Sequence, residues 1–261
     1  MRLGLCIEMA FAKLPFEDRI RKAADCGLRN VEMWFVDKSF KGKPERLAKI
    51  AQSHDVTITN TVIGSPDGSI GGGLTNPAKR KTWLKRAAMT IEFTRQAGIP
   101  ATIVCTGNEV KGMSHSKMLA SVIAGLKPAV EMAEEAGVTL LLEPLNTRYD
   151  HPGYFLTSSD LGAEICRKIG SPRMKLLFDC YHMQIMEGDL VNHIERNIDV
   201  IGHFHSAGVP GRHELYEGET DYPFLLTRIE KLGYQGVFGL EYMPSFDPEE
   251  SVRKTLAYLK W

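Results

Sequence analysis

The sequence predicts a single (β/α)8 TIM barrel, an α/β fold in which eight parallel strands alternate with helices. Near-continuous apolar runs recur eight times, amphipathic helical segments separate them, and 261 residues allow about 33 for each of eight units. Runs that are apolar on both faces are typical of strands in a parallel sheet covered by helices. Since such a barrel needs about 250 residues, we expect one domain over residues 1–261.

The predicted strands are short and apolar. They lie at residues 3–7, 31–35, 56–62, 101–105, 138–142, 174–178, 200–204 and 237–240. Segments at 15–27, 78–98, 114–137 and 225–233 repeat apolar residues at helical spacing, and each ends at a glycine, which favours helix termination. A doubly wound open sheet is the alternative, but it normally has a glycine-rich first turn, and Glu8-Met-Ala-Phe follows the first strand here.

The composition argues against several classes of protein. The chain has 32 Lys+Arg against 32 Asp+Glu, so we expect no general basic field for nucleic acid or an anionic membrane surface. It contains no run of about 18 apolar residues, which argues against a membrane span. The five cysteines are widely spaced and form no CxxC pair, which favours reduced thiols in a cytoplasmic protein.

The last four predicted strands each lead into a polar residue. These residues are Glu143, Asp179, His205 and Glu241. Active-site residues of (β/α)8 barrels lie at the carboxyl ends of the strands, so we expect the four side chains to converge on one rim. A single acid at a strand end is more often a helix cap, but four consecutive strands with this pattern weaken that interpretation.

The convergence of three carboxylates indicates a metal site. Carboxylates at close range repel one another unless a positive centre holds them ionised, so the sequence predicts one divalent ion. Three carboxylates and one imidazole suit Mg²⁺ or Mn²⁺, with water or substrate oxygens in the remaining positions. Zinc is an open alternative, although no cysteine joins the set. A metal with open positions is a Lewis acid for a carbonyl or alkoxide oxygen.

Five stretches of the second half carry a resemblance to a known family. They are LLLEPLN (140–146), HPGYFL (151–156), LLFDCYHMQIMEGDL (176–190), GHFHSAGVPGRHE (202–214) and GLEYMP (239–244). The chain resembles the hydroxypyruvate isomerase family, within the wider xylose-isomerase-like barrels that include ketose 3-epimerases. The resemblance implies that Glu143, Asp179, His205 and Glu241 bind the metal. It also implies that Glu143 and Glu241 are the catalytic acid/base pair.

Three further residues are candidate substrate contacts. His182 lies three positions after Asp179, where resembling epimerases place a histidine against substrate; a helix-capping or core role is the alternative. Arg212 could clamp a carboxylate or hydroxyl oxygen, or it could be a solvated loop charge. Glu8, after the first strand, could orient the substrate or form a structural salt bridge. We interpret His203 as facing the helices and not the barrel interior.

The resemblance implies an isomerase that acts on a small hydroxy-carbonyl compound through an enediolate. The first hypothesis is the conversion of hydroxypyruvate to tartronate semialdehyde. The alternatives are a ketose 3-epimerase for D-tagatose, psicose or ribulose, and an isomerase of another short hydroxy-oxo acid. Ketose 3-epimerases commonly carry another Glu shortly after the first catalytic one. Pro-Leu-Asn-Thr-Arg-Tyr-Asp-His follows Glu143 here, which favours the hydroxypyruvate side.

Two other classes of function are less consistent with the sequence. An endonuclease IV-like DNA-repair nuclease would need about three metals, more rim histidines and a basic groove. A silent sugar-binding or assembly protein would not need two carboxylates beside a metal. The segment SPDGSIGGG (65–73) is expected to be a flexible loop over the rim. Barrels of this kind often form homo-oligomers, but no segment of the sequence defines an interface.

Overall fold

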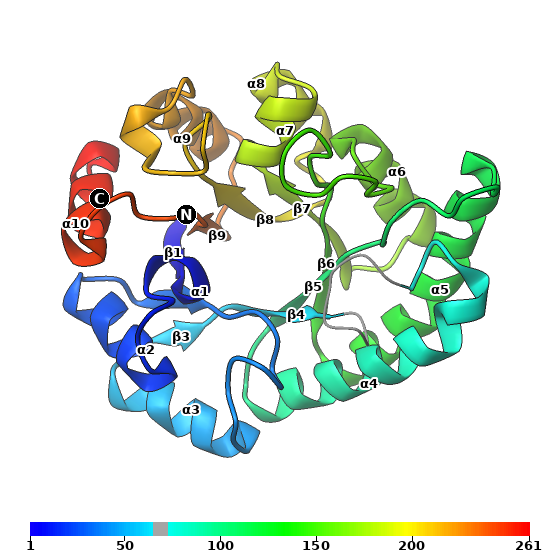
Figure 1. Ribbon diagram of the computed structural model, residues 1–261, viewed down its shortest axis with the longest axis horizontal. Helices are drawn as coiled ribbons and strands as arrows, with labels where there is room; N and C mark the ends of the chain where they lie inside the picture. The colour runs from blue at the N-terminus through cyan, green and yellow to red at the C-terminus, as the bar shows by residue number, and fades with distance from the viewer. Residues whose placement is uncertain (65–72) are drawn as a thin grey trace.

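A ring of parallel strands forms the centre of the protein in the computed structural model, which describes residues 1–64 and 73–261 (Figure 1). The strands in these ranges are β1 (Arg2–Cys6), β2 (Asn30–Glu32), β3 (Thr57–Ile58), β4 (Asn60–Ile63), β5 (Ala101–Val104), β6 (Thr139–Leu142), β7 (Met174–Asp179), β8 (Ile201–Ser206) and β9 (Val237–Leu240). Their order in the sheet is β3-β2-β1-β9-β8-β7-β6-β5-β4. The prediction of a parallel α/β barrel is therefore confirmed.

Two features complete the ring of strands. The first and last strands are neighbours, since β1 pairs with β9 in the register Leu3 with Phe238. The predicted strand at 56–62 is divided into β3, which pairs with β2, and β4, which pairs with β5. Thr59 lies between them and donates its backbone N–H to the Val31 carbonyl at 2.8 Å. The one predicted strand is thus two short segments that change partner.

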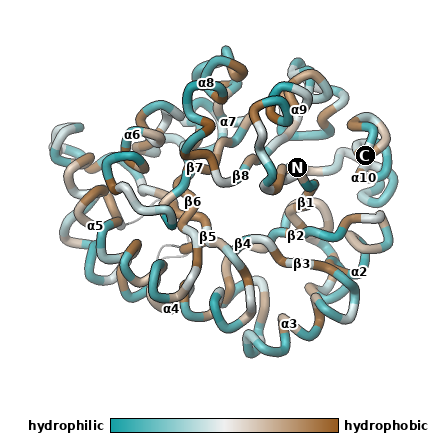
Figure 2. Tube along the Cα trace, turned by 180° about the vertical axis from the view of Figure 1, so that it is seen from behind, coloured by the Kyte–Doolittle hydropathy of each residue, from teal (hydrophilic) through white to brown (hydrophobic). Residues whose placement is uncertain are grey.

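Helices surround this ring on the outside, except the short α1 (Ile7–Ala10), which lies beside β1 and within the ring in this view (Figure 1). They are α1, α2 (Phe16–Asp25), α3 (Pro44–Ser53), η1 (Pro77–Lys79), α4 (Arg80–Gln96), α5 (His115–Ala136), α6 (Ser159–Ile169), α7 (Cys180–Met186), α8 (Leu190–Asn197), η2 (Leu215–Glu217), α9 (Tyr222–Lys231) and α10 (Pro248–Leu259). The tube in Figure 2 is brown along β5, β6 and β7 and mostly teal over the outward turns of α3 and α4. The apolar core therefore lies inside the ring of helices.

The predicted helices begin and end close to the expected residues because their termination signals are local. Ser114 accepts a hydrogen bond from the Lys117 N–H and caps α5. Gly137 ends the same helix with φ 70°, a left-handed conformation that favours glycine. The buried face of α5 includes Met118, Val122 and Leu126, which follow the predicted spacing. Local caps and helical periodicity were sufficient to define this helix.

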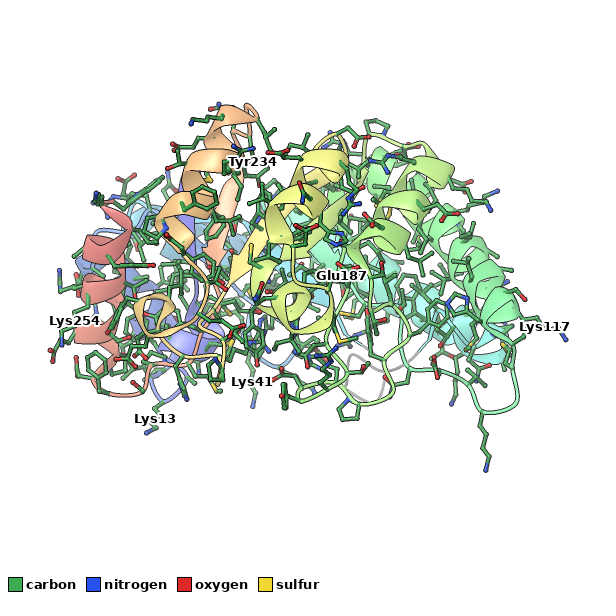
Figure 3. The ribbon with its side chains drawn as sticks, turned by 90° about the horizontal axis from the view of Figure 1, so that it is seen from above. Lys13, Lys41, Lys117, Glu187, Tyr234 and Lys254 are labelled. Atoms are coloured by element: carbon green, nitrogen blue, oxygen red, sulfur yellow. The ribbon has the colours of Figure 1, made fainter. Side chains whose placement is uncertain are left out.

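The two ends of the barrel are distinct, and one carries the loops that follow the strands. Lys13 and Lys41, which follow β1 and β2, lie at the end opposite Tyr234, which precedes β9 (Figure 3). The carboxyl ends of the strands thus meet at one rim. The predicted rim loop at 65–73 lies outside the described residues except for Gly73.

The composition also led to expectations about the cysteines, about membrane spans and about the number of domains. Each of the five cysteines is buried and free in the described structure. Within residues 1–64 and 73–261, we find no helix with the length and hydropathy that crossing a membrane requires. The prediction of one domain over residues 1–261 stays a prediction.

Candidate active site

The four groups expected at the strand ends lie together at the rim. Glu143 follows β6, Asp179 ends β7, His205 belongs to β8 and Glu241 follows β9. All four are buried, and one ligand atom from each lies within 4.8 Å of the others. Since each strand is anchored by its neighbours, the barrel holds these groups at fixed positions. The structure thus brings together the whole set that was expected from the sequence.

His205 stands between the two glutamates. Its Nδ1 lies 3.5 Å from Glu143 Oε1 and 3.4 Å from Glu241 Oε2, and it makes no hydrogen bond of good geometry to any described residue. Its Nε2 lies 2.6 Å from Glu32 Oε2. Burial lowers the pKa of His205, but the nearby charges of Glu241 and Glu32 raise it well above its usual value. An unpartnered, buried nitrogen facing two carboxylates is what a metal ligand requires.

The carboxyl groups of the site differ in the direction in which their pKa values are shifted. Burial raises the pKa of Glu143, and burial raises that of Asp179 to about 7. Burial also acts on Glu241, but the positive charges of His205 and Arg212 outweigh it and hold the pKa of Glu241 well below its usual range. Carboxyl groups whose pKa values are pushed apart can act as an acid and a base at the same pH.

Asp179 and His182 are joined by the first turn of α7. Asp179 Oδ1 accepts hydrogen bonds from the backbone N–H groups of Tyr181 at 2.7 Å and His182 at 3.2 Å. The capping role that is common for such an acid is therefore present. The other oxygen, Oδ2, lies 3.5 Å from His182 Nε2. One oxygen of Asp179 thus caps the helix, while the other remains directed to the site.

His182 is held by Asn146, on the segment after β6. The Asn146 side-chain nitrogen lies 2.7 Å from His182 Nδ1, and the Asn146 backbone N–H donates to the same atom at 3.3 Å. Because a backbone N–H can only donate, His182 Nδ1 is the acceptor and Nε2 carries the proton. This Nε2 is buried and has no hydrogen-bond partner among the described residues. His182 therefore has a free donor at the cavity.

Arg212 is buried at the rim and is not a solvated loop charge. Only 12% of its side chain is exposed, and its guanidinium forms an ion pair with Glu241 and lies 4.0 Å from Asp150. The guanidinium also lies over the Tyr181 ring, 5.2 Å from its centroid. Its backbone has φ 60°, in the left-handed region that few residues other than glycine adopt. Its Nε has no partner among the described residues.

A cavity of about 210 Å³ lies between these groups. It is lined by Trp34, Phe35, Val62, Ile103, Cys105, Glu143, Leu145, His151, His182, Arg212 and Glu241. Sites for drug-sized ligands usually measure about 300–1,000 Å³, so this volume suits a molecule of a few carbon atoms. The lining is apolar on the side of β2, β4 and β5 and ionic on the side of β6 and β9.

Glu8 is placed differently from the other expected residues. It lies in α1 and forms a salt bridge with Arg19 at 2.7 Å, and it accepts a longer hydrogen bond from the Trp34 backbone N–H at 3.4 Å. It is not among the residues that line the cavity. These contacts are those of a structural salt bridge, the alternative role that the sequence allowed for Glu8.

The orientation predicted for His203 is wrong. Residues two apart on a strand point to the same face, so His203 faces the barrel interior with His205. Its Nε2 lies 2.9 Å from Glu32 Oε1, and the two imidazole rings meet edge to face with centroids 5.1 Å apart.

Several residues of the site were not expected from the sequence. Glu32 lies under His205, and Trp34 Nε1 donates to Glu241 Oε1 at 3.2 Å. Asp150 accepts hydrogen bonds from Asn146 and from the Tyr181 hydroxyl, at 2.5 and 2.9 Å. A signal existed for Glu32, since it is an acid inside an otherwise apolar predicted strand. The pairing of Asn146 with His182 leaves no such local signal.

Comparisons with known proteins agree with this architecture. The family model for the xylose isomerase-like TIM barrel matches residues 20–260. The chain therefore belongs to the xylose isomerase-like TIM barrel family.

Two curated relatives narrow the class. The chain is 34% identical to a 2-oxo-tetronate isomerase of Cupriavidus necator over 93% of both chains. It is 31% identical to a hydroxypyruvate isomerase of Escherichia coli over 97% of both. The resemblance noted from the motifs is confirmed, and the chain is an isomerase of this family.

Two solved structures share the fold. One, described as an AP endonuclease of family 2 from Brucella melitensis, is 26% identical and superposes with a TM-score of 0.90 over 100% of this chain and 98% of the other. A D-psicose 3-epimerase of Clostridium cellulolyticum superposes with a TM-score of 0.85 over 100% and 98% at 15% identity, which concerns the fold alone.

Proposed function

We propose that this isomerase moves a proton between two adjacent carbons of a short hydroxy-2-oxo acid. Hydroxypyruvate, which would become tartronate semialdehyde, is the first choice, and 2-oxo-tetronate is the next. Both relatives carry such a substrate in their names and cover almost the whole chain. One observation carries the proposal. The carboxylates of Glu143 and Glu241 flank His205 Nδ1, at 3.5 and 3.4 Å, in a small cavity that Arg212 also lines.

The two glutamates divide the proton transfer between them. Glu241 is ionised and is the base that removes a proton from the hydroxymethyl carbon of hydroxypyruvate. Glu143, on the other side of His205 Nδ1, delivers a solvent-derived proton to the neighbouring carbon. As the aldehyde forms, the hydroxyl proton passes to the oxygen of the former carbonyl, so the product is an isomer of the substrate with the same atoms. In the alternative mechanism, one glutamate both removes the proton and returns it to the neighbouring carbon. The amount of solvent deuterium incorporated at carbon distinguishes this mechanism from the transfer by two glutamates.

The donor set fits a divalent ion. Glu143, Asp179, His205 and Glu241 would hold it, and we propose Mg²⁺ or Mn²⁺ because three of the four donors are carboxylates. The fit rests on the buried His205 Nδ1, which has no hydrogen-bond partner among the described residues and faces two of the other ligands. When bound, the ion would supply Lewis acidity to the substrate carbonyl.

Arg212 and His182 are the proposed substrate contacts. The Arg212 guanidinium is the cation of the cavity lining, and a guanidinium pairs well with a carboxylate. The free Nε2–H of His182 can donate to a substrate oxygen, and Asn146 prevents the ring from turning away. These contacts suit a substrate with a carboxylate next to its carbonyl. For Glu8 we propose the structural salt-bridge role, since its oxygens contact Arg19 and Trp34.

The experiment is a substrate comparison in deuterated water. The purified protein would be treated with a chelator, reloaded with Mg²⁺ or Mn²⁺, and incubated with hydroxypyruvate, 2-oxo-tetronate, ribulose and psicose. We expect turnover of the 2-oxo acids with incorporation of solvent deuterium at carbon, and none by the chelated protein. Turnover of the ketoses alone would refute the acid substrate and support the 3-epimerase. Cleavage of a DNA duplex with an abasic site would support the nuclease alternative.

A further inference from the structure

A buried carboxylate below the metal-binding set has no role in the proton transfer described above. Glu32 is the last residue of β2, is 1% exposed, and points across the barrel interior toward β8. Each of its oxygens meets a different imidazole, with Oε2 2.6 Å from His205 Nε2 and Oε1 2.9 Å from His203 Nε2. We propose that Glu32 is a positioning residue that holds His205 in the tautomer and orientation needed to bind the metal. The proposal rests on the metal site of the proposed function.

The buried position of Glu32 is energetically unfavourable. Burial of an ionised carboxylate destabilises a fold unless the group is paired and hydrogen-bonded, and even a paired group is often less stable than apolar packing of the same volume. The layers inside a (β/α)8 barrel are usually filled by branched apolar side chains. A charged group here lowers stability relative to such a layer, so a role other than packing is indicated.

The surrounding strands leave room for the Glu32 side chain. A Cβ at Gly239 on β9 would overlap Glu32 Oε1, and it would lie 2.8 Å from His205 Cδ2. A Cβ at Gly4 on β1 would lie 3.2 Å from the same Glu32 oxygen. Two strands therefore place glycine where the carboxylate crosses the interior. The space is shaped for Glu32 and the ring that it contacts.

The hydrogen bonds to Glu32 determine the tautomer of His205. A carboxylate only accepts hydrogen bonds, so both Nε2 atoms must carry a proton. His205 Nδ1 is then the atom left to offer a lone pair, and it faces Glu143 and Glu241. Metal-bound histidines commonly donate their other ring N–H to a carboxylate, which fixes the ring and raises its basicity. Glu32 occupies this position relative to the proposed metal.

Glu32 is shared between two rings. His203 donates to the other carboxylate oxygen and anchors it. With both oxygens occupied, the carboxylate cannot rotate away from His205. The three residues Glu32, His203 and His205 could also hold a second metal ion. The separations of 2.6 and 2.9 Å are those of direct hydrogen bonds, which favours positioning.

The test is the variant Glu32→Gln with Mn²⁺ titration by calorimetry. A glutamine accepts from one imidazole but turns its NH₂ toward the other, so one ring must change tautomer or lose its partner. We expect one Mn²⁺ per chain in the wild type and a dissociation constant about 10- to 100-fold higher in the variant. Asp160→Asn is the matched control, because Asp160 also faces a histidine, His193 at 3.3 Å, but lies on α6. Its dissociation constant should stay unchanged.

A second measurement uses only the wild type, in case Glu32→Gln does not fold. With histidine labelled with ¹⁵N and Mg²⁺ bound, correlation spectra should show His205 protonated at Nε2 and bound to metal through Nδ1. Metal binding through Nε2, two ions per chain, or equal Mn²⁺ affinity in Glu32→Gln would overturn the role of Glu32. Absence of Mn²⁺ binding by the wild type would instead refute the metal site itself, and this inference with it.

Discussion

The two sides of the barrel contribute different things to the site. Strands β6 to β9 each bring an ionisable group to the rim, and these groups form the proposed metal and proton-transfer set. Strands β2, β4 and β5, with the residues that follow them, contribute an apolar wall, the N–H donor of Trp34, and Glu32 beneath the rim. One side thus supplies the reacting groups, and the other supplies the surroundings that orient them. Ionic groups at the rim can bind a metal and transfer protons only when supporting contacts from the opposite side hold them in the required geometry.

The largest effect should come from removing a carboxylate on the ionic side. Glu143→Gln and Glu241→Gln keep the shape of the side chain but cannot exchange a proton, so we expect kcat to fall by about 10³-fold or more in each. Steady-state kinetics with hydroxypyruvate and Mn²⁺ would measure the loss, and circular dichroism would check the fold. Near-normal activity in both variants would refute the acid/base assignment and remove the contrast between the two sides.

Metal affinity on the same side should depend on pH. Burial raises the pKa of Asp179 to about 7, against the opposing charges of Arg212 and His205, and the ion requires the carboxylate. The dissociation constant for Mn²⁺ should therefore fall by about tenfold for each pH unit as the pH rises to about 7. It should continue to fall above pH 7, because the pKa of the His205 ring, which must also lose a proton to bind the ion, is raised well above its usual value. Calorimetry at pH 6, 7 and 8, in buffers of different ionisation enthalpy, would measure the affinity and the released protons.

The raised pKa of Asp179 also affects how the stability of the metal-free protein depends on pH. The pKa of Asp179 is higher in the folded state than its ordinary value of about 3.9, so protonation of this group stabilises the metal-free fold at low pH. That contribution is present below about pH 4 and is lost as the pH rises through about 7. Affinity for Mn²⁺ that does not change between pH 6 and 8 would contradict the coupling.

On the apolar side, the N–H of Trp34 should have a moderate effect. Trp34→Phe keeps an aromatic wall but removes the donor to Glu241 Oε1 at 3.2 Å. A hydrogen bond to a charged group is worth about 1.5–3 kcal/mol, so we expect kcat/KM to fall by about tenfold or more. Trp261→Phe is the control, since Trp261 is exposed at the chain end. If Trp34→Phe retains full kcat/KM, the apolar side only excludes water.

The smallest effect should come from Glu8, which was expected at the rim from the sequence. Its contacts are a salt bridge with Arg19 and a long hydrogen bond with Trp34. Glu8→Gln should leave KM within about twofold of the wild type and lower Tm by about 5 °C or more, because the Arg19 and Glu8 side chains are only 17% and 8% exposed and the loss of one partner leaves the other charge unpaired. Kinetics and thermal unfolding would be compared. A tenfold rise in KM at unchanged Tm would restore the substrate-orienting role.

The elements that the sequence predicted well depend on local signals. The predicted strand at 237–240 coincides with β9, and α5 lies between its serine cap and its terminal glycine. The strand expected at 31–35 was too long, since β2 ends at Glu32. The apolar residues Met33 and Trp34 continue the pattern but lie outside β2, and their backbone groups bond to Asn60 and Val62 of β4. Hydrophobicity alone does not indicate where a ladder ends.

The candidate site shows the same division. The acids and the histidine after the last four strands were visible because each follows an apolar run, and the barrel directs the ends of parallel strands to one rim. The pairing of Asn146 with His182 and the contacts of Asp150 were not visible, because they join side chains from different βα segments.

The sequence by itself determined the alternation of strands and helices and the residue types at the rim. Both are carried by patterns within a few neighbouring residues, namely apolar runs, caps and polar strand ends. Only the tertiary structure decided which nitrogen of His205 is free, which carboxylate supports it from β2, and that Glu8 pairs with Arg19. The physical reason is that a hydrogen bond or charge pair forms only when two groups, far apart in the chain, are placed to within a few tenths of an ångström of the required distance.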